Sequence, residues 1–255
     1  MSNRTVYPDL KDRVVFVSGG GSGIGASIVE HFCRQGSKVA FVDINEETSN
    51  ELIKKLDDGQ HSIPQFINCD LCDIPALQAS IADVEKNLGP VRVLVNNAAH
   101  DQRHDIDEVT PEYWDDRMAI NLKHQFFAAQ AVRKGMAAAG GGAIINMGSV
   151  SWMMGMGGMP GYTTAKSAVE GLTRSLARDF GEEGIRVNSV VPGHIWTQRQ
   201  IDLWTTPEFA ARLMENQCLK RNLQPEDVAR VVLFFASDDA GACTSQTYIV
   251  DGGLT

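Results

Sequence analysis

The chain has 255 residues, of which 43% are hydrophobic and 22% charged, enough to bury the core of one large α/β domain or two small ones. Its formal net charge of −9 disfavours nucleic-acid partners and anionic membrane surfaces. No apolar run approaches the roughly 18 residues that span a bilayer, and residues 1–8 lack the apolar segment of a signal peptide. The odd count of five cysteines is typical of free thiols, which indicates a cytoplasmic protein.

Short apolar runs alternate with helical patterns along the whole chain. We expect strands at 13–18, 38–43, 65–70, 91–96, 143–149, 186–191 and 247–250. We expect helices from the glycine-rich loop to about 35, then at 46–57, 73–88, 111–138, 160–184 and 225–237. This alternation predicts one Rossmann-type domain over residues 1–255, with a doubly wound parallel sheet and helices on both faces. The interrupted stretch at about 194–224 is expected to form a mobile substrate lid.

A glycine-rich loop, Ser18 to Gly25, joins the first expected strand to the first helix. Gly19, Gly23 and Gly25 leave room for a pyrophosphate to approach the backbone, and a helix N-terminus favours its charge. The spacing is G-x-x-x-G-x-G rather than the commoner G-x-G-x-x-G. A tight turn needs the same residues, so the position after the first strand is what favours a dinucleotide.

Asp43 ends the second expected strand, about 20 residues beyond the loop, where a carboxylate can accept the hydroxyls of an adenosine ribose. No lysine or arginine lies in the glycine loop or directly after Asp43, so a 2′-phosphate would meet a negative charge. This favours NAD as the cofactor. The alternative is that Asp43 caps the helix that follows it.

Tyr162 and Lys166 are four residues apart, which places them on one face of a helix. A neighbouring cation lowers the pKa of a phenol from about 10 towards neutrality. We therefore expect Lys166 to make Tyr162 a general acid or base. The alternative is a tyrosine that packs on a lysine stem.

Cysteine and histidine spacings give little sign of a metal site. Cys69 and Cys72 form a C-x-x-C, but no second cysteine pair follows, so we interpret this spacing as coincidence. The six histidines show no H-E-x-x-H pattern, and we expect no metal.

Together these motifs resemble the short-chain dehydrogenase/reductase family over the whole chain. The resemblance rests on the glycine loop, Asp70, Asn96–Ala98, Asn121, Ser149, Tyr162 with Lys166, Pro192–Gly193 and Thr197. It implies an NAD-dependent oxidoreductase that acts on a CH–OH group and assembles as a homotetramer. One departure is Ala99, where the family usually has glycine; alanine would be strained there if the position needs a positive φ.

The resemblance also implies roles for individual residues. Asn121 would hold a proton-relay water, Ser149 would bind the substrate oxygen, and Tyr162 would take the hydroxyl proton while hydride passes to the nicotinamide. Asp70 would contact adenine, and Lys166 would also hold the nicotinamide ribose. The implied cofactor-binding residues are Gly19, Ser22, Gly23, Ile24, Gly25, Asp43, Asp70, Leu71, Asn97, Ala98, Tyr162, Lys166, Pro192, Gly193, Ile195 and Thr197.

Within that family the chain resembles the bacterial aldose 1-dehydrogenases of the D-xylose type. The shared features are Asp101, Arg103 and His104, and the stretches 148–152, 197–200 and 217–220. They imply that the anomeric carbon of a sugar is oxidised to a lactone. The implied substrate residues are Asp101, Arg103, His104, Ser149 and Trp152. The methionine-rich stretch 153–160 departs from the pattern, so a pentose, a 6-deoxyhexose and a galactose-type hexose all stay open.

Other functions fit the same motifs. Residues 100–104 are dense in donors and acceptors, but a solvated loop has the same composition. One alternative is oxidation of another secondary alcohol, such as a polyol or a hydroxy acid. Another is reduction of a 3-oxoacyl substrate with NADPH, which Asp43 disfavours. A non-catalytic dinucleotide sensor on the same fold is the third.

Overall fold

The computed structural model describes residues 5–255, so the expectation for residues 1–8 lies partly outside the described residues. Seven parallel strands form one sheet in the order β3-β2-β1-β4-β5-β6-β7. The chain therefore winds in one direction from β1 to β3 and in the other from β4 to β7, which makes the sheet doubly wound. The strands are β1 (Val14–Ser18), β2 (Lys38–Asp43), β3 (Gln65–Asn68), β4 (Val93–Asn96), β5 (Gly142–Met147), β6 (Ile185–Pro192) and β7 (Thr247–Val250).

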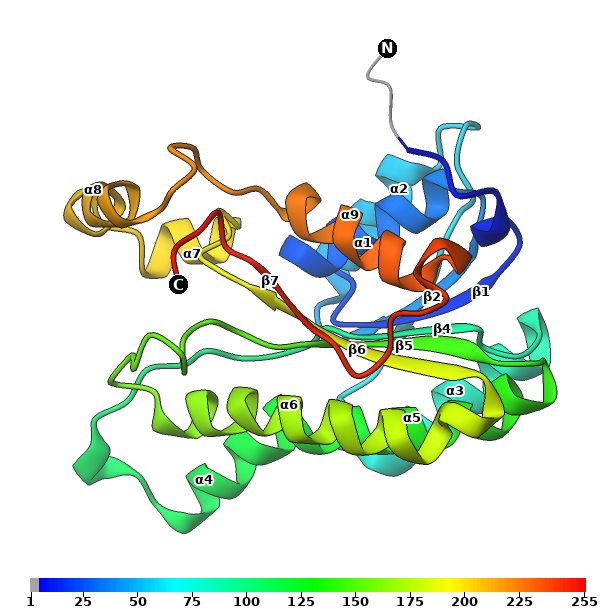
Figure 1. Cartoon of the computed structure of the whole chain (residues 1–255), viewed down its shortest axis with the longest axis horizontal. Helices are drawn as coiled ribbons and strands as arrows, with labels where there is room; N and C mark the ends of the chain where they lie inside the picture. The colour runs from blue at the N-terminus through cyan, green and yellow to red at the C-terminus, as the bar shows by residue number, and fades with distance from the viewer. Residues whose placement is uncertain (1–4) are drawn as a thin grey trace.

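Helices cover both faces of this sheet, as the sequence predicts. In Figure 1, α1, α2 and α9 lie on one side of the strands, and α3, α5 and α6 lie on the other. The α-helices are α1 (Gly23–Arg34), α2 (Glu46–Leu56), α3 (Ile74–Leu88), α4 (Pro111–Met118), α5 (His124–Ala138), α6 (Pro160–Phe180), α7 (Gln198–Leu203), α8 (Pro207–Asn216) and α9 (Pro225–Ala236). None of the helices in residues 5–255 is long and apolar enough to cross a membrane.

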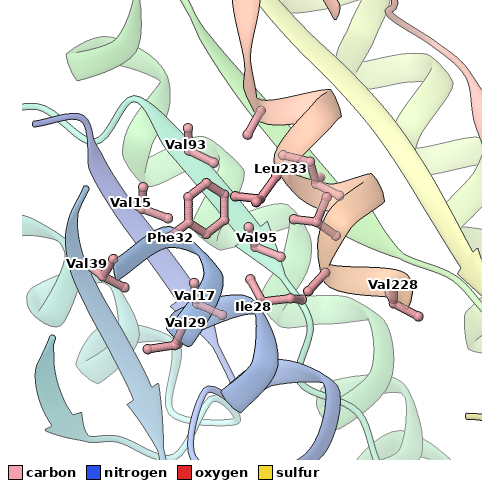
Figure 2. Packing of buried hydrophobic residues seen from close by; sticks show 14 of the residues in the cluster. Val15, Val17, Ile28, Val29, Phe32, Val39, Val93, Val95, Val228 and Leu233 are labelled. Carbon is pink, nitrogen blue, oxygen red and sulfur yellow. The ribbon is translucent and has the colours of Figure 1, made fainter. Parts of the chain in front are cut away.

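The hydrophobic core divides into two clusters, one on each face of the sheet. Phe32 of α1 is fully buried, and Figure 2 shows its ring between Val15 of β1, Val93 of β4 and Leu233 of α9. The second cluster includes Phe16 of β1 and Leu77 of α3. Because strand residues alternate between the faces, Val15 and Phe16 serve opposite clusters. Both faces are apolar, as a parallel sheet with two helical layers requires.

The predicted helix at 111–138 is interrupted in the structure. A π-helical segment, Ala119–Lys123, joins α4 to α5. Such segments widen the helix by one residue and often occur at functional sites. The apolar spacing on either side remains helical, so periodicity alone does not show the interruption.

The interrupted stretch after β6 contains two short helices, α7 and α8, for which the sequence analysis gave no bounds. Thr197 and Thr206 cap them by accepting hydrogen bonds from the backbone amides of Gln200 and Phe209. In Figure 1 both helices project beyond the main layers of the molecule, close to the C-terminus. A parallel β-bridge between Ile195 and Leu223 joins the two ends of this segment.

Candidate active site

A cavity of about 720 Å³ lies beyond the carboxyl ends of the strands, where ligands bind in doubly wound sheets. The loops that follow β1 to β6 all contribute to its wall. Every residue that the sequence assigns to the cofactor lines this cavity.

The glycine-rich loop forms one end of the cavity. Gly19 has a φ of +66°, and a Cβ on Gly25 would lie 1.8 Å from the carbonyl oxygen of Gly19, so a side chain at Gly25 has no room. Helix α1 begins at Gly23, and the side chain of its N-cap residue, Ser22, makes no capping hydrogen bond. The first amides of α1 therefore face the cavity uncapped, which suits the pyrophosphate of a dinucleotide.

Asp43 lines the cavity next to this loop. Its Oδ2 accepts a hydrogen bond from the Gly21 amide at 2.8 Å, and its Oδ1 accepts one from the Asn45 amide at 3.0 Å. The N-cap of α2 is Asn45, whose side chain accepts from the Thr48 amide. Asp43 is thus held in place by two backbone amides, and it is not the residue that caps α2.

The loop after β4 is joined to the glycine loop by Asn97. Its Nδ2 donates to the carbonyl oxygens of Ser18 at 3.1 Å and Gly19 at 2.9 Å.

Among the described residues, the non-glycine residues with a positive φ are Asp12 and Ser245. Ala99 is not among them, so its backbone is not in the left-handed region. The strain that a positive φ would have caused at Ala99 is therefore absent.

Ser149, Tyr162 and Lys166 all line the cavity, Ser149 from the loop after β5 and the other two from the N-terminal half of α6. The side chains of Ser149 and Tyr162 are hydrogen-bonded to each other. The Lys166 side chain is 1% exposed, and its Nζ donates to the Met147 carbonyl oxygen at 2.7 Å. The same Nζ lies 5.8 Å from the centre of the Tyr162 ring.

The pKa values of this pair differ from the sequence-based expectation. Burial raises the pKa of Tyr162 to about 12, and the hydrogen bond with Ser149 opposes this rise only in part. Burial also lowers the pKa of Lys166 to about 7, so its ammonium is only partly protonated at neutral pH. Desolvation is thus the larger effect on both groups in the ligand-free protein. A lowered pKa of Tyr162 through Lys166 and the cationic nicotinamide ring together stays a prediction for the cofactor-bound protein.

Asn121 lies in the π-helical segment and is fully buried. Its side-chain oxygen accepts from the His100 amide at 2.8 Å, and its Nδ2 donates to the carbonyl oxygens of His100 and Arg117. The Asn121 side chain is outside the cavity lining and acts on the cavity through the backbone of His100, which does line it.

The loop after β4 and helix α7 form the other end of the cavity. Arg199 of α7 donates to Asp101 Oδ1 at 3.1 Å, and Gln200 donates to Asp101 Oδ2 at 2.7 Å. The guanidinium carbon of Arg103 lies 4.4 Å from the centre of the Trp204 ring. We refer to these three contacts as the lid latch, because they join the loop at 100–104 to the segment that carries α7.

Two of the five expected substrate residues lie elsewhere. The ring of His104 packs edge-to-face against Tyr113, whose hydroxyl lies 2.9 Å from its Nδ1. Trp152 lines a separate, open depression against α6, with Thr163 and Ser167. Neither residue lines the main cavity.

Other residues take their place at this end of the cavity. They are His100, Met154, Met156, His194, Arg199, Gln200, Trp204, Phe209 and Arg212. Most of them come from the lid segment, whose position over the strand ends no sequence motif gives. In residues 5–255 no cluster of histidine, cysteine and carboxylate side chains could hold a metal ion, and Cys69 and Cys72 are free thiols.

The donors, acceptors and open backbone of this cavity fit a nicotinamide dinucleotide, and the comparisons with known proteins agree. The chain belongs to the short-chain dehydrogenase/reductase family, whose enzymes act on CH–OH groups with a nicotinamide dinucleotide. A family model described as enoyl-(acyl carrier protein) reductase matches residues 19–255.

The similar proteins include two sugar dehydrogenases. The chain is 48% identical over 248 residues to "Probable galactose dehydrogenase GalD" of Rhizobium meliloti (strain 1021), with 97% of each chain covered. It is also 48% identical over 248 residues to D-xylose 1-dehydrogenase of Caulobacter vibrioides (strain NA1000 / CB15N), with 97% of this chain and 98% of that one covered. The solved short-chain type dehydrogenase/reductase of Mycobacterium ulcerans has the same fold, with a TM-score of 0.90, 25% identity and coverage of 98% and 91%.

Proposed function

We propose that this protein oxidises the anomeric carbon of a free aldopyranose to a lactone, with NAD as the hydride acceptor. One observation carries the proposal: a single cavity joins Ser149, Tyr162 and Lys166 to an end lined by many polar side chains. The similarity to two sugar dehydrogenases over nearly the whole chain supports it.

Substrate chemistry supports the anomeric carbon. The ring oxygen next to this carbon stabilises the positive charge that develops as hydride leaves. Such a substrate needs little activation, but its hydroxyl groups must be distinguished from one another. A site that hydrogen-bonds a hydroxyl rejects an analogue that lacks it, because its own polar groups are then unpaired.

In the proposed mechanism Tyr162 takes the proton of the anomeric hydroxyl, and Ser149 holds the oxygen. The bound dinucleotide supplies the hydride acceptor. Because burial raises the pKa of Tyr162 to about 12, its phenol is protonated in the ligand-free protein at neutral pH. Positive charge close to the phenol is needed to lower that pKa, and we assign this effect to protonated Lys166 together with the oxidised cofactor. Asn121 fixes the loop of His100 beside the reacting groups.

We propose NAD rather than NADP because of Asp43. This carboxylate lines the cavity at the end of β2, and the residue that follows it in the chain and in the lining is the uncharged Ile44. A ribose with free hydroxyls can donate to the carboxylate, whereas a 2′-phosphate would be repelled.

Within the substrate end, Asp101 and Arg103 remain our candidates for sugar recognition, whereas His104 and Trp152 do not line the cavity in this conformation. We further propose a homotetramer, as in the family, and a cytoplasmic location. All five cysteines lie in the described residues and are free thiols, which is typical of a reducing compartment.

A substrate panel tests this function. Purified protein is given NAD and a series of pentoses, 6-deoxyhexoses and hexoses, and NADH formation is followed by its absorbance. Parallel reactions contain a polyol, a hydroxy acid, and a 3-oxoacyl thioester with NADPH, with the Tyr162→Phe protein as a control for contaminating enzymes. We expect one or a few aldoses to be the best substrates. Failure of every aldose beside strong turnover of another class would refute the proposal.

A further inference from the structure

His194 lies two residues after β6, and it lines the substrate end of the cavity. Its ring centre lies 5.0 Å from that of Phe209 and 5.9 Å from that of Trp196, with both contacts edge-to-face. Two aromatic neighbours therefore fix the orientation of this ring. The charges of Arg103 and Asp101 both act on the pKa of His194, which shows that the three side chains share one end of the cavity.

Thr205 determines which ring nitrogen of His194 carries the proton. Thr205 Oγ1 donates its one hydrogen to the Gln200 carbonyl oxygen at 2.8 Å, because a carbonyl oxygen can only accept. The same Oγ1 lies 3.1 Å from Nε2 of His194, so it accepts there and Nε2 donates. Burial and the charge of Arg103 lower the pKa of His194, which keeps the ring neutral at pH 7. A neutral imidazole has one N–H, and Nδ1 is therefore left with a lone pair.

This Nδ1 has no hydrogen-bond partner among the described residues. It is also not one of the buried polar atoms that lack a partner, so it retains contact with solvent. The guanidinium groups that line the same cavity, those of Arg103, Arg199 and Arg212, can only donate, and the charge of Arg103 acts on His194. Each oxygen of Asp101 already accepts a hydrogen bond from α7, so only part of its acceptor capacity is left for a ligand. A ligand hydroxyl at this end needs an acceptor for its own hydrogen, and Nδ1 provides one.

We propose that Nδ1 of His194 accepts a hydrogen bond from a sugar hydroxyl other than the reacting one, and so selects sugars that carry this hydroxyl. This inference rests on the proposed aldose oxidation. His194 is then a specificity-determining residue, and Thr205 is the positioning residue that sets its tautomer.

The test uses analogues of the best aldose in which one hydroxyl at a time is replaced by hydrogen or by fluorine. At one ring position either replacement should lower the kcat/KM of wild type roughly 10-fold. Neither replacement can donate a hydrogen bond to Nδ1, although fluorine can still accept one. His194→Phe should lose this discrimination at that position and keep it at the others. The control His61→Phe changes a histidine outside the cavity lining and should behave as wild type.

Thr205 gives a second test, because it lies outside the cavity lining. Thr205→Val removes the hydroxyl that sets the tautomer and should weaken discrimination at the same position, whereas Thr205→Ser should retain it. If His194→Phe does not fold, the Thr205 pair alone decides the outcome.

The inference is overturned if His194→Phe, or Thr205→Val in its place, discriminates as strongly as wild type at every position. The inference is also overturned if, at the position where His194→Phe loses discrimination, wild type accepts the fluorinated sugar but rejects the deoxy sugar. The protein group that contacts that hydroxyl would then be a hydrogen-bond donor. A wild type that oxidises no aldose refutes the proposed function itself and is distinguishable from both results.

Discussion

Tyr162 lies one helical turn before Lys166 on α6, and both side chains reach the cavity. If Tyr162 takes the substrate proton, Tyr162→Phe should lower kcat by roughly 10²–10⁴ while the affinity for NAD stays the same. Steady-state kinetics and NAD titration by calorimetry measure the two quantities. Tyr248→Phe serves as the matched control, because Tyr248 is exposed on β7 and outside the cavity. Near wild-type turnover in Tyr162→Phe would remove Tyr162 from the catalytic role.

Asp43 is the residue on which cofactor choice depends. Wild type should prefer NAD over NADP by at least about 10-fold in kcat/KM, which corresponds to about 1.4 kcal/mol. Asp43→Asn removes the negative charge but keeps an oxygen that can accept from the Gly21 amide. The preference of Asp43→Asn for NAD over NADP should therefore be smaller than that of wild type, while the glycine-rich loop keeps its structure. Asp58→Asn, on an exposed loop, is the control. A wild-type preference for NADP would contradict the role of Asp43.

At the scale of secondary-structure elements, the lid latch joins α7 to the loop at 100–104. The Arg199–Asp101 pair is partly exposed, so by itself it stabilises the observed position of α7 by at most about 1 kcal/mol. Asp101→Ala removes the contacts to both Arg199 and Gln200. We expect a higher KM for the sugar, a smaller change in the KM for NAD, and faster limited proteolysis within 198–216.

The Arg199→Ala variant provides the comparison for this lid experiment. It breaks one of the two contacts of Asp101. A protease should therefore cleave this variant within 198–216 more slowly than it cleaves Asp101→Ala. The double variant should be cut no faster than Asp101→Ala, because residues that share one interaction are not additive. Additive effects would show that Arg199 stabilises this segment through a contact other than the one with Asp101.

Helices α1 and α9 pack together on one face of the sheet, and Phe32 lies in that contact (Figure 2). Its side chain is fully buried, so Phe32→Ala should lower the free energy of unfolding by about 3–5 kcal/mol through lost burial and a cavity. Urea denaturation measures the change. Ile63→Ala at an exposed site should stay within about 0.5 kcal/mol. A similarly small effect at Phe32 would contradict the packing of α1 on α9.

For the molecule as a whole, buried histidines predict how stability depends on pH. His124 is fully buried, and burial together with Lys166 lowers its pKa from 6.5 to about 3. The unfolded chain binds a proton below pH 6.5 and the folded chain does not, so stability falls as the pH falls between these two values. The contribution of His124 alone is about 2 kcal/mol between pH 7.5 and pH 5.

Urea denaturation at pH 7.5 and pH 5 tests this pH dependence. The His124→Gln variant keeps a side-chain donor for the Ala98 carbonyl oxygen but does not titrate in this range. It should lose less stability than wild type between the two pH values. His61→Gln, at a partly exposed site, is the matched control. An equal pH dependence in wild type and His124→Gln would show that folding does not lower the pKa of His124.

The predicted order of strands and helices, their parallel pairing and the cofactor end of the cavity follow from local signals. Apolar periodicity marks each element, and the glycines of 19–25 and Asp43 occupy fixed places at strand ends. All the predicted cofactor residues line the cavity for this reason. The position of each of these residues depends on the strand that it follows, and the order of residues along the chain shows which strand that is.

Tertiary packing decides the substrate end of the cavity. His104 and Trp152 belong to stretches that the sequence assigned to this end, but His104 packs on Tyr113 and Trp152 lines a separate depression. His194 and Trp204 carry no motif, and they enter the wall because the segment with α7 and α8 folds back over the strand ends. The π-helical turn at Asn121 and the pKa of Tyr162 depend likewise on neighbours distant in the chain. Local sequence determines what a segment forms, whereas long-range burial determines where its side chains point and which charges they keep.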